Sequence, residues 1–400
     1  MRAFALQLTI TIAAAGFAGA ALLSGLDRLA AQDGTIPAGI AAVIHWPYAR
    51  NAPINAAYIA ASRHDFGTAI PLMNAALLSD PVDETVIGGL GRVRLTAGDP
   101  AGADDAFRVS ATRGWRDQVT HGYWMAQSIA VGDFQSAALQ ADALLNDPLG
   151  EPAREQVYNA LLEYDGGRNA LASRLRAHPN WASGVVFDVD HATADQLAAR
   201  ADLIARTGPG VWTCFQTGAL IDRLIEAGDT RNATAVHNAS CVPGGRPDPS
   251  GNALNDPHFV HFATEPRASQ LDWFATYSSD VTISPLTNAA GHGGVQIAAS
   301  RGVAEQVIAQ RVAIGPGTYT LTWQMPDSDP ASAGKLAAGI GCGTDLATAA
   351  PGTPVPGKPG TFAVTLRFAG NCTTPTLAFW LRPTDRTVTL DAVTLVRAGP

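Results

Sequence analysis

The sequence has little lysine and few charged residues of either sign. Lys335 and Lys358 are its two lysines, charged residues make up 16% of the chain, and the formal net charge is −8. Nonspecific binding to nucleic acid needs a basic surface that attracts phosphates, so this composition argues against a nucleic-acid-binding protein. Hydrophobic residues make up 46% of the 400 positions, which is enough to bury the cores of two or three domains.

Signature motifs of common enzyme classes are missing. The chain contains no GxSxG, HExxH or Walker sequence, and no two carboxylates stand out as a glycosidase pair. The run Gly88-Gly89-Leu90-Gly91 lies inside a helical pattern, where we expect close helix packing and not a phosphate-binding loop. We therefore predict a protein that is not an enzyme and has no cofactor.

Cysteine is also scarce, and its spacing argues against zinc fingers and dithiol redox motifs. No CxxC motif occurs, and the four cysteines form one close pair in each of two regions. In an oxidising compartment this spacing predicts two disulfides, Cys214–Cys241 and Cys342–Cys372. The alternative is a cytosolic protein with four buried free thiols, which would leave the N-terminal segment unexplained.

Potential metal ligands occur without the spacing of a known metal site. For each group we favour a structural role, such as helix capping by Asp190 or Thr193, and we predict no metal site. The groups considered are His258 with His261, the run Asp188-Val189-Asp190-His191, and the oxygen-bearing set Asp248, Asn252, Asn255 and Asp256.

Residues 3–26 form an uncharged run, AFALQLTITIAAAGFAGAALLSGL. As a helix it would be about 36 Å long, enough to cross a bilayer. A signal peptide cleaved after Ala18-Gly19-Ala20 is the alternative. Because apolar residues continue through Leu22 and Leu23, we favour an uncleaved anchor in the inner membrane. We predict a single-pass protein with most of its chain in the periplasm, or else a secreted protein.

A sequence pattern recurs every 34 residues in the N-terminal half. Asp65, Asp99 and Asp133 lie in short turns, and each is followed four residues later by an alanine. Small residues at such positions let two antiparallel helices pack closely, and Pro81 is placed to end the first unit. The pattern resembles the tetratricopeptide repeat. It predicts stacked helical hairpins that bind partner proteins along a groove.

The helical pattern continues beyond these repeats. A fourth unit is expected over 158–179, with its turn at Asp165-Gly166-Gly167, followed by helices at 194–206, at 211–227 and up to Ala239. A Cys214–Cys241 bond would join the last two helices. We interpret this pair as the C-terminal cap of a short helical solenoid, because end units expose a face that inner units bury.

After Cys241 the composition changes to a run rich in Pro, Gly, Asn and Asp, and then to alternating apolar and polar residues. Such alternation is typical of strands with one buried face, and we expect Gly315-Pro316-Gly317 to close a hairpin. Short strands separated by turns predict an antiparallel β-sandwich, with a jelly roll favoured over an immunoglobulin-like sandwich. The strands are expected at 281–286, 295–299, 306–314, 318–325, 336–342, 361–368, 376–381 and 387–396.

We therefore predict a multidomain chain, α followed by β. Its parts are a signal anchor and stalk (1–31), a tetratricopeptide-like helical repeat domain (32–241), a linker (242–257) and a β-sandwich (258–400).

Aromatic side chains in the β region are candidates for a sugar-binding platform. Trp323 lies on the apolar face of its strand and is expected in the core. Trp380 alternates with core residues and should point outward, next to Arg382. Trp273 and Tyr277 form a second candidate pair. For both pairs the alternative is ordinary packing, in the core or beneath a neighbouring segment.

The layout as a whole resembles tetratricopeptide-repeat proteins from exopolysaccharide and capsule assembly clusters of alphaproteobacteria. Leu271-Asp272-Trp273 and the run Pro316-Gly317-Thr318-Tyr319-Thr320-Leu321 carry the C-terminal part of this resemblance. It implies a non-enzymatic periplasmic accessory protein whose partners belong to a polysaccharide machinery. Two further hypotheses stay open, a carbohydrate-binding protein that holds the polymer and a hydrolase without a recognisable motif.

Overall fold

The structure is a computed structural model of the 400-residue chain. Its contacts form two compact units, residues 1–149 and 150–400, and each is described by itself. The structure describes residues 2–29, 49–114, 117–147, 149–242, 251–264, 267–276, 279–286, 293–299, 305–326, 334–342, 349–384 and 387–398.

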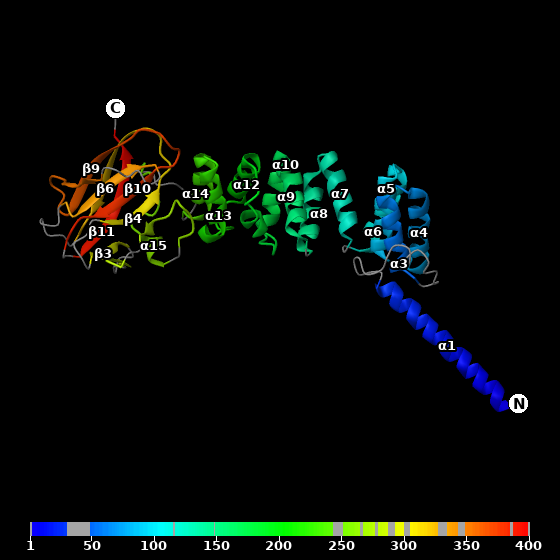
Figure 1. The fold of residues 1–400 in the computed structure, drawn as a ribbon. Coiled ribbons are helices and arrows are strands. Elements are labelled where there is room, and N and C mark those ends of the chain that lie inside the picture. The colour runs from blue at the N-terminus through cyan, green and yellow to red at the C-terminus, as the bar shows by residue number, and fades with distance from the viewer. Residues whose placement is uncertain are drawn as a thin grey trace. The chain divides into compact units, whose positions relative to one another are not determined.

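The first unit begins with helix α1 (Arg2–Leu29) (Figure 1). Among the residues that the structure describes, no helix has the length and apolar character needed to cross a membrane, so the predicted transmembrane helix is not confirmed. Asp27 is buried near the end of α1 and accepts hydrogen bonds from the backbone N–H groups of Arg50 (3.1 Å) and Ala52 (2.8 Å). It thereby caps α3 (Asn51–Ser62), whose N-cap residue provides no side-chain cap.

The 34-residue spacing corresponds to three successive helical hairpins. They pair α3 with α4 (Phe66–Ser79), α5 (Glu84–Thr96) with α6 (Pro100–Arg113), and α7 (Gln118–Ala130) with α8 (Phe134–Asn146). The expectation of a helical N-terminal region is confirmed. Its assignment to the tetratricopeptide family remains a prediction.

The repeated aspartates and alanines have separate roles in these hairpins. Asp65, Asp99 and Asp133 are N-caps, and each carboxylate accepts a backbone N–H three residues later, at 3.1, 2.9 and 3.1 Å. The alanine that follows each of them is fully buried, which allows the paired helices to approach closely. The 34-residue period therefore arises because the second helix of each hairpin begins with an aspartate cap and a closely packed alanine.

The glycines of the 88–91 run are close-packing positions, as predicted. A Cβ on Gly88 would lie 1.8 Å from a carboxylate oxygen of Asp117, and one on Gly91 would lie 2.9 Å from the ring of Phe107. Both glycines are in the interior of α5 and leave space for the neighbouring helices.

Six helices open the second unit, within the part of the chain that the structure describes. Helix α10 starts at Asp165, so the predicted turn at Asp165-Gly166-Gly167 is wrong, and the connection lies at 163–164. A Cβ on Gly167 would meet the carbonyl oxygen of Leu161 at 2.1 Å, so this glycine serves a close approach of two helices. The helices are α9 (Glu151–Leu162), α10 (Asp165–Leu175), α11 (Gly184–Phe187), α12 (Ala194–Thr207), α13 (Cys214–Glu226) and α14 (Thr230–Ser240).

Both predicted disulfides are present. Cys214–Cys241 joins the first residue of α13 to the C-cap of α14, and Cys342–Cys372 joins the end of β6 (Leu336–Gly341) to the segment before β10 (Thr376–Leu381). Disulfides form and persist in oxidising compartments, and these two indicate a location outside the cytoplasm.

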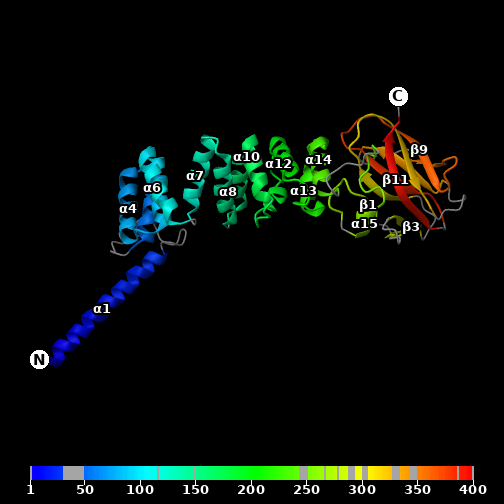
Figure 2. The same cartoon turned by 180° about the vertical axis from the view of Figure 1, so that it is seen from behind.

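The strands of the second unit form two antiparallel sheets, which confirms the predicted two-sheet β region (Figures 1 and 2). Their orders are β1-β4-β10-β6-β7 and β2-β3-β11-β5-β9-β8. The short helix α15 (Val260–Thr264) precedes the first strand. The remaining strands are β1 (Phe274–Ala275), β2 (Val281–Pro285), β3 (Val295–Ala299), β4 (Glu305–Arg311), β5 (Gly317–Gln324), β7 (Ala350–Pro351), β8 (Thr353–Pro354), β9 (Thr361–Phe368) and β11 (Val388–Arg397).

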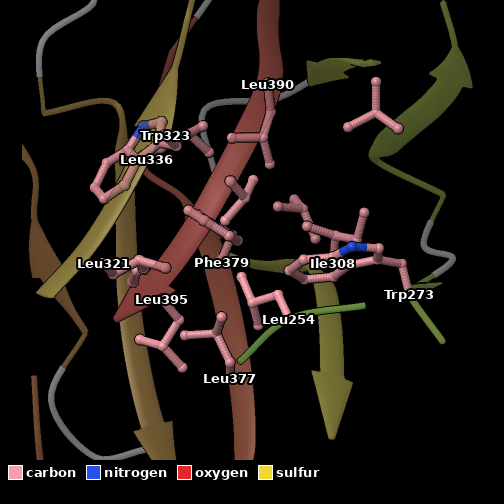
Figure 3. Close-up of a cluster of buried hydrophobic side chains, with 14 of the residues drawn as sticks. Leu254, Trp273, Ile308, Leu321, Trp323, Leu336, Leu377, Phe379, Leu390 and Leu395 are labelled. Atoms are coloured by element: carbon pink, nitrogen blue, oxygen red, sulfur yellow. The ribbon is translucent and has the colours of Figure 1, made fainter. Parts of the chain in front are cut away.

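The core between the sheets is built from the apolar faces that the alternation predicted. Phe379 lies between Trp323 and Trp273, with ring centroids 5.4 and 6.3 Å away (Figure 3). Trp323 is 1% exposed, which confirms its predicted core position.

Two local expectations in the β region are corrected. Strands β4 and β5 belong to different sheets, so Gly315-Pro316-Gly317 connects the sheets and does not close a hairpin. Part of the predicted linker packs against the β core, because Leu254 is buried in it and the backbone N–H of Ala253 donates to Leu395.

Candidate functional site

A pocket of about 360 Å³ lies between α3 and α5, the first helices of two successive hairpins. Tyr58 and Ser62 line it from α3, and Arg92 and Thr96 face them from α5. These positions are related by the 34-residue period, 58 to 92 and 62 to 96. The pocket is therefore a product of the repeat itself, formed where equivalent helix faces meet. Its volume is within the range of small-ligand and side-chain pockets.

The pocket combines an aromatic ring with a cation. The guanidinium carbon of Arg92 lies 5.6 Å from the centroid of the Tyr58 ring, a cation–π contact. Burial raises the pKa of Tyr58 above its ordinary value, Arg92 opposes this shift and Asp117 adds to it. Tyr58 therefore stays neutral at physiological pH, and Arg92, whose side chain reaches the surface, carries the charge of the pocket.

The surface that contains the pocket, formed by the first helix of each hairpin, continues from α5 to α7. In α7 the positions equivalent to Arg92 and Thr96 are Ala126 and Ala130, which are both small and exposed. Helices α5 and α7 are in contact. A ligand seated beside Arg92 can thus extend along α7 without meeting large side chains at these positions.

Trp380 is half-buried, and the adjacent Arg382 is exposed. The cross-strand partners of Trp380 are Gln306 and Ala337, and its indole nitrogen is buried with no hydrogen-bond partner among the described residues. Ala337 and Ala378 are buried beside it, so only part of this sheet face is open to solvent.

The other candidate platform is not displayed on the surface. Trp273 is 3% exposed, packs at 5.0 Å from the ring of Phe259, and donates its indole N–H to the carbonyl oxygen of Asp256 at 3.0 Å. Its ring therefore presents no face to a sugar. Tyr277 lies outside the described residues.

A buried polar cluster holds α9, α11 and α12 together. Arg200 is fully buried, donates to the carbonyl oxygens of Val185 and Asp188, and lies 3.5 Å from the carboxylate of Glu155. Tyr158 is buried nearby and donates to the carbonyl oxygen of Trp181 at 3.3 Å. Because the central groups are buried, we interpret this cluster as packing and not as a binding site.

A second polar cluster surrounds the Cys214–Cys241 bond. Within the described residues, Cys214, His237 and Cys241 are the only group of three metal-ligating residues whose ligand atoms all lie within 4.8 Å of one another. Nε2 of His237 lies 3.2 Å from a carboxylate oxygen of Asp272. Burial raises the pKa of Asp272, but the hydrogen bond and charge of His237 and two backbone N–H groups bring it below its ordinary value.

Several of the other residues considered as metal ligands have protein partners. His258 contacts Asp391 at 3.1 Å, and the carboxylate of Asp256 accepts the backbone N–H groups of Val260 and His261. The backbone N–H of Asn255 donates to the side-chain oxygen of Gln310, and its side-chain amide donates to the carbonyl oxygen of Leu271. Thr193 caps α12 through a capping box, as one of the two predicted alternatives. Asp248 lies outside the described residues.

Sequence reasoning did not single out Tyr58, Arg92 or His237. The first two could have been found from the repeat, because they are separated by its period. His237 lies four residues before Cys241 on a predicted helix, which places both on one face. Its approach to Cys214 depends on how α13 and α14 pack.

No family model matches the chain, and no curated protein matches it. Among solved structures, the enzymatically active domain of tailspike protein 4 of bacteriophage CBA120 aligns with 12% identity and a TM-score of 0.27, covering 41% of this chain and 23% of that one. A putative sugar binding protein from Bacteroides thetaiotaomicron aligns with 13% identity and a TM-score of 0.24, covering 37% of this chain and 100% of that one. At these TM-scores neither likeness bears on function.

Proposed function

We propose that the protein is a non-enzymatic scaffold outside the cytoplasm that binds a partner protein through the first helices of its repeats. The observation that carries this proposal is the pocket between α3 and α5. A helical repeat that only spaces two parts of a chain has no need for an aromatic ring and an exposed cation on this face.

The residues that line the pocket indicate which kind of partner peptide would bind there. Tyr58 and Val93 offer apolar contact, and Arg92 is the charged residue of the lining. A peptide with an apolar side chain next to an acidic one satisfies both features, because a carboxylate pairs with the guanidinium. The two disulfides support a periplasmic or secreted location, and the resemblance to capsule-assembly proteins suggests a partner from a polysaccharide machinery. Residues 3–26 would hold the protein at the inner membrane unless they are cleaved.

Site-specific photo-crosslinking in the native host tests the protein-binding function. A photoreactive residue at Ser62, in the lining, should capture a distinct partner band that the same residue at Leu78, 84% exposed on α4, does not capture. Arg92→Glu should reduce the band at least about tenfold, since a charge-assisted contact of about 1.4 kcal/mol or more becomes repulsive.

The matched control is Arg113→Glu, which makes the same charge change at an exposed position at the end of α6. It should leave the band unchanged. Equal loss in both variants would show that overall charge, and not the pocket, controls capture, and capture at Leu78 alone would refute the proposed face.

Carbohydrate binding by the β region is the second candidate. The alternation of successive strands between the two sheets from β3 to β6 supports a jelly roll, the architecture of many sugar-binding modules. Half-buried Trp380 lies on β10, and exposed Arg382 directly follows that strand, where its backbone N–H donates to the carbonyl oxygen of Lys335. Two cations near the end of the strand that carries Trp380 favour an acidic polymer over a neutral one.

Affinity electrophoresis of the full chain in gels containing acidic or neutral polysaccharides tests this candidate. We expect retardation by an acidic polymer that falls at least about fivefold in Trp380→Ala and Arg382→Ala, corresponding to about 1 kcal/mol per lost contact. Lys358→Ala removes an exposed cation on the turn before β9 and should have no effect. Retardation that Lys358→Ala weakens as much as Arg382→Ala would indicate nonspecific charge attraction.

A further inference from the structure

A buried histidine lies beside the Cys214–Cys241 bond, although a disulfide needs no such neighbour. His237 is four residues before Cys241 on α14, is 3% exposed, and has a ring nitrogen within 4.8 Å of both sulfurs. Cys214 is the first residue of α13, the helix that faces α14. Two sulfurs and an imidazole from two helices thus converge on one point.

The imidazole of His237 is oriented through one of its nitrogens, and the other nitrogen makes no hydrogen bond to the described residues. Nε2 contacts Asp272, and Asp272 is fixed by the backbone N–H groups of Ser269 (2.8 Å) and Ala268 (3.2 Å). Nδ1 is buried and has no hydrogen-bond partner among the described residues. A buried ring nitrogen without a partner is costly to keep in a protein that only needs packing at this position. The pattern of carboxylate, imidazole and free nitrogen is the one that orients histidine ligands toward a metal.

We propose that reduction of the Cys214–Cys241 bond converts this point into a site for one zinc-class divalent cation, bound by both thiolates and by Nδ1 of His237. A dithiol reductant supplies two electrons and two protons, is itself oxidised to a disulfide, and leaves two thiols. The cation then displaces both thiol protons into solvent and forms two metal–sulfur bonds and one metal–nitrogen bond. Thiolate and imidazole ligands select zinc over calcium or magnesium.

The spacing of the ligand atoms suits such a cation. Metal–ligand bonds of about 2.3 Å to sulfur and about 2.0 Å to nitrogen place tetrahedral ligands about 3.5 to 3.8 Å apart. A ring nitrogen of His237 and the two sulfurs already lie within 4.8 Å of one another, so the main change is separation of the sulfurs after reduction. Cys214 and Cys241 are partly exposed, which leaves room for a water as fourth ligand.

The site has a consequence for the cap. The disulfide joins α13 to α14, and the same three side chains bridge them through the cation once the disulfide is open. Asp222 of α13 accepts the backbone N–H of Gln270 at 2.7 Å, and His237 of α14 contacts Asp272, so both helices also hold the segment that leads into the β region. Metal binding would keep this contact in place under reducing conditions.

Cobalt binding to the full chain tests the site, because Co²⁺ occupies zinc sites and gives a thiolate charge-transfer band. The protein is reduced with dithiothreitol, desalted without oxygen and titrated with Co²⁺. We expect one equivalent to produce the band, and Zn²⁺ to abolish it. His237→Ala and the double variant Cys214→Ser/Cys241→Ser should show no saturable band. Asp272→Asn should bind about tenfold more weakly, as expected for loss of an orienting partner.

The double variant Cys342→Ser/Cys372→Ser is the matched control and should bind like the wild type. Circular dichroism during the titration separates binding from folding. Recovery by Co²⁺ of any helical signal lost on reduction supports the proposal. Absence of the band in the reduced wild type, whether folded or unfolded, overturns it, as does a band of equal strength in His237→Ala or in the Cys214→Ser/Cys241→Ser variant.

Discussion

Tyr158 shows how a single buried side chain connects structure with pH dependence. Burial, together with the negative charge of Asp188, raises its pKa to about 12, against the opposing effect of Arg154 and Arg200. The unfolded state has the ordinary pKa of about 10. As the pH rises above about 10 the unfolded chain loses this proton first, so the folded state is progressively destabilised up to about pH 12.

The variant Tyr158→Phe should therefore lose less stability than the wild type between about pH 10 and about pH 12. Below that range it should be less stable by about 1 kcal/mol, because the hydrogen bond to Trp181 is missing. Urea unfolding at several pH values measures both effects. Parallel stability curves for the two proteins across the alkaline range would contradict the assignment.

The sequence predicts the burial of some aromatic residues better than that of others. Alternation on a strand correctly placed Trp323 inward, because successive side chains of a strand point to opposite faces. Trp273 precedes the short strand β1, where no such periodicity applies. Its burial against Phe259 and Phe379 brings together residues from separate segments of the chain, which depends on long-range packing.

At the scale of elements, the repeated aspartates fix where the second helix of each hairpin begins. The carboxylate of Asp99 accepts the backbone N–H of Gly102 at 2.9 Å at the start of α6. We expect Asp99→Ala to lower the free energy of unfolding of the first unit by about 1 kcal/mol. Thermal or urea unfolding of the full chain, followed by circular dichroism, measures this change.

Asp105→Ala is the control for this variant, because Asp105 is exposed in the interior of the same helix. It should cause no loss of stability and even a gain of up to about 0.7 kcal/mol, since alanine is the better helix former. A loss of equal size in both variants would show that the charge of Asp99, and not its capping bond, matters.

Strand positions were predictable from alternation, with β3, β9 and β10 at the expected residues. The connection at Gly315-Pro316-Gly317 was not, since a short turn between two strands fits a hairpin as well as a crossing between sheets. Whether the turn closes a hairpin depends on which strand pairs with β4. In place of β5, that partner is β10, which lies far along the chain. Likewise, the sequence did not indicate that Gly167 lies in α10 against the carbonyl oxygen of Leu161 in a neighbouring helix.

At the scale of the molecule, two covalent bonds tie distant parts of the second unit together. Cys342–Cys372 closes a loop with a sequence separation of 30 and joins the end of β6 to the segment that precedes its paired strand β10. Replacing both residues by serine should lower the free energy of unfolding by roughly 3 kcal/mol, mainly because the unfolded chain regains freedom. Urea unfolding without reductant measures the loss.

Reduced wild type, kept free of metal, provides the comparison, since it lacks this bond and Cys214–Cys241 as well. It should be less stable than the serine variant. A serine variant as stable as the oxidised wild type would mean that the sheet pairing of β6 with β10 alone holds this region.

Local chemistry written in the sequence determined the helical period, its caps, most of the strands and both disulfide pairs. These features depend on neighbours within one or two turns or on the spacing of a few cysteines. The tertiary structure alone decided the pocket between α3 and α5, the half-burial of Trp380 and the convergence of His237 on the cysteine pair. Each of these depends on how separate elements pack, and packing is set by contacts between residues far apart in the chain.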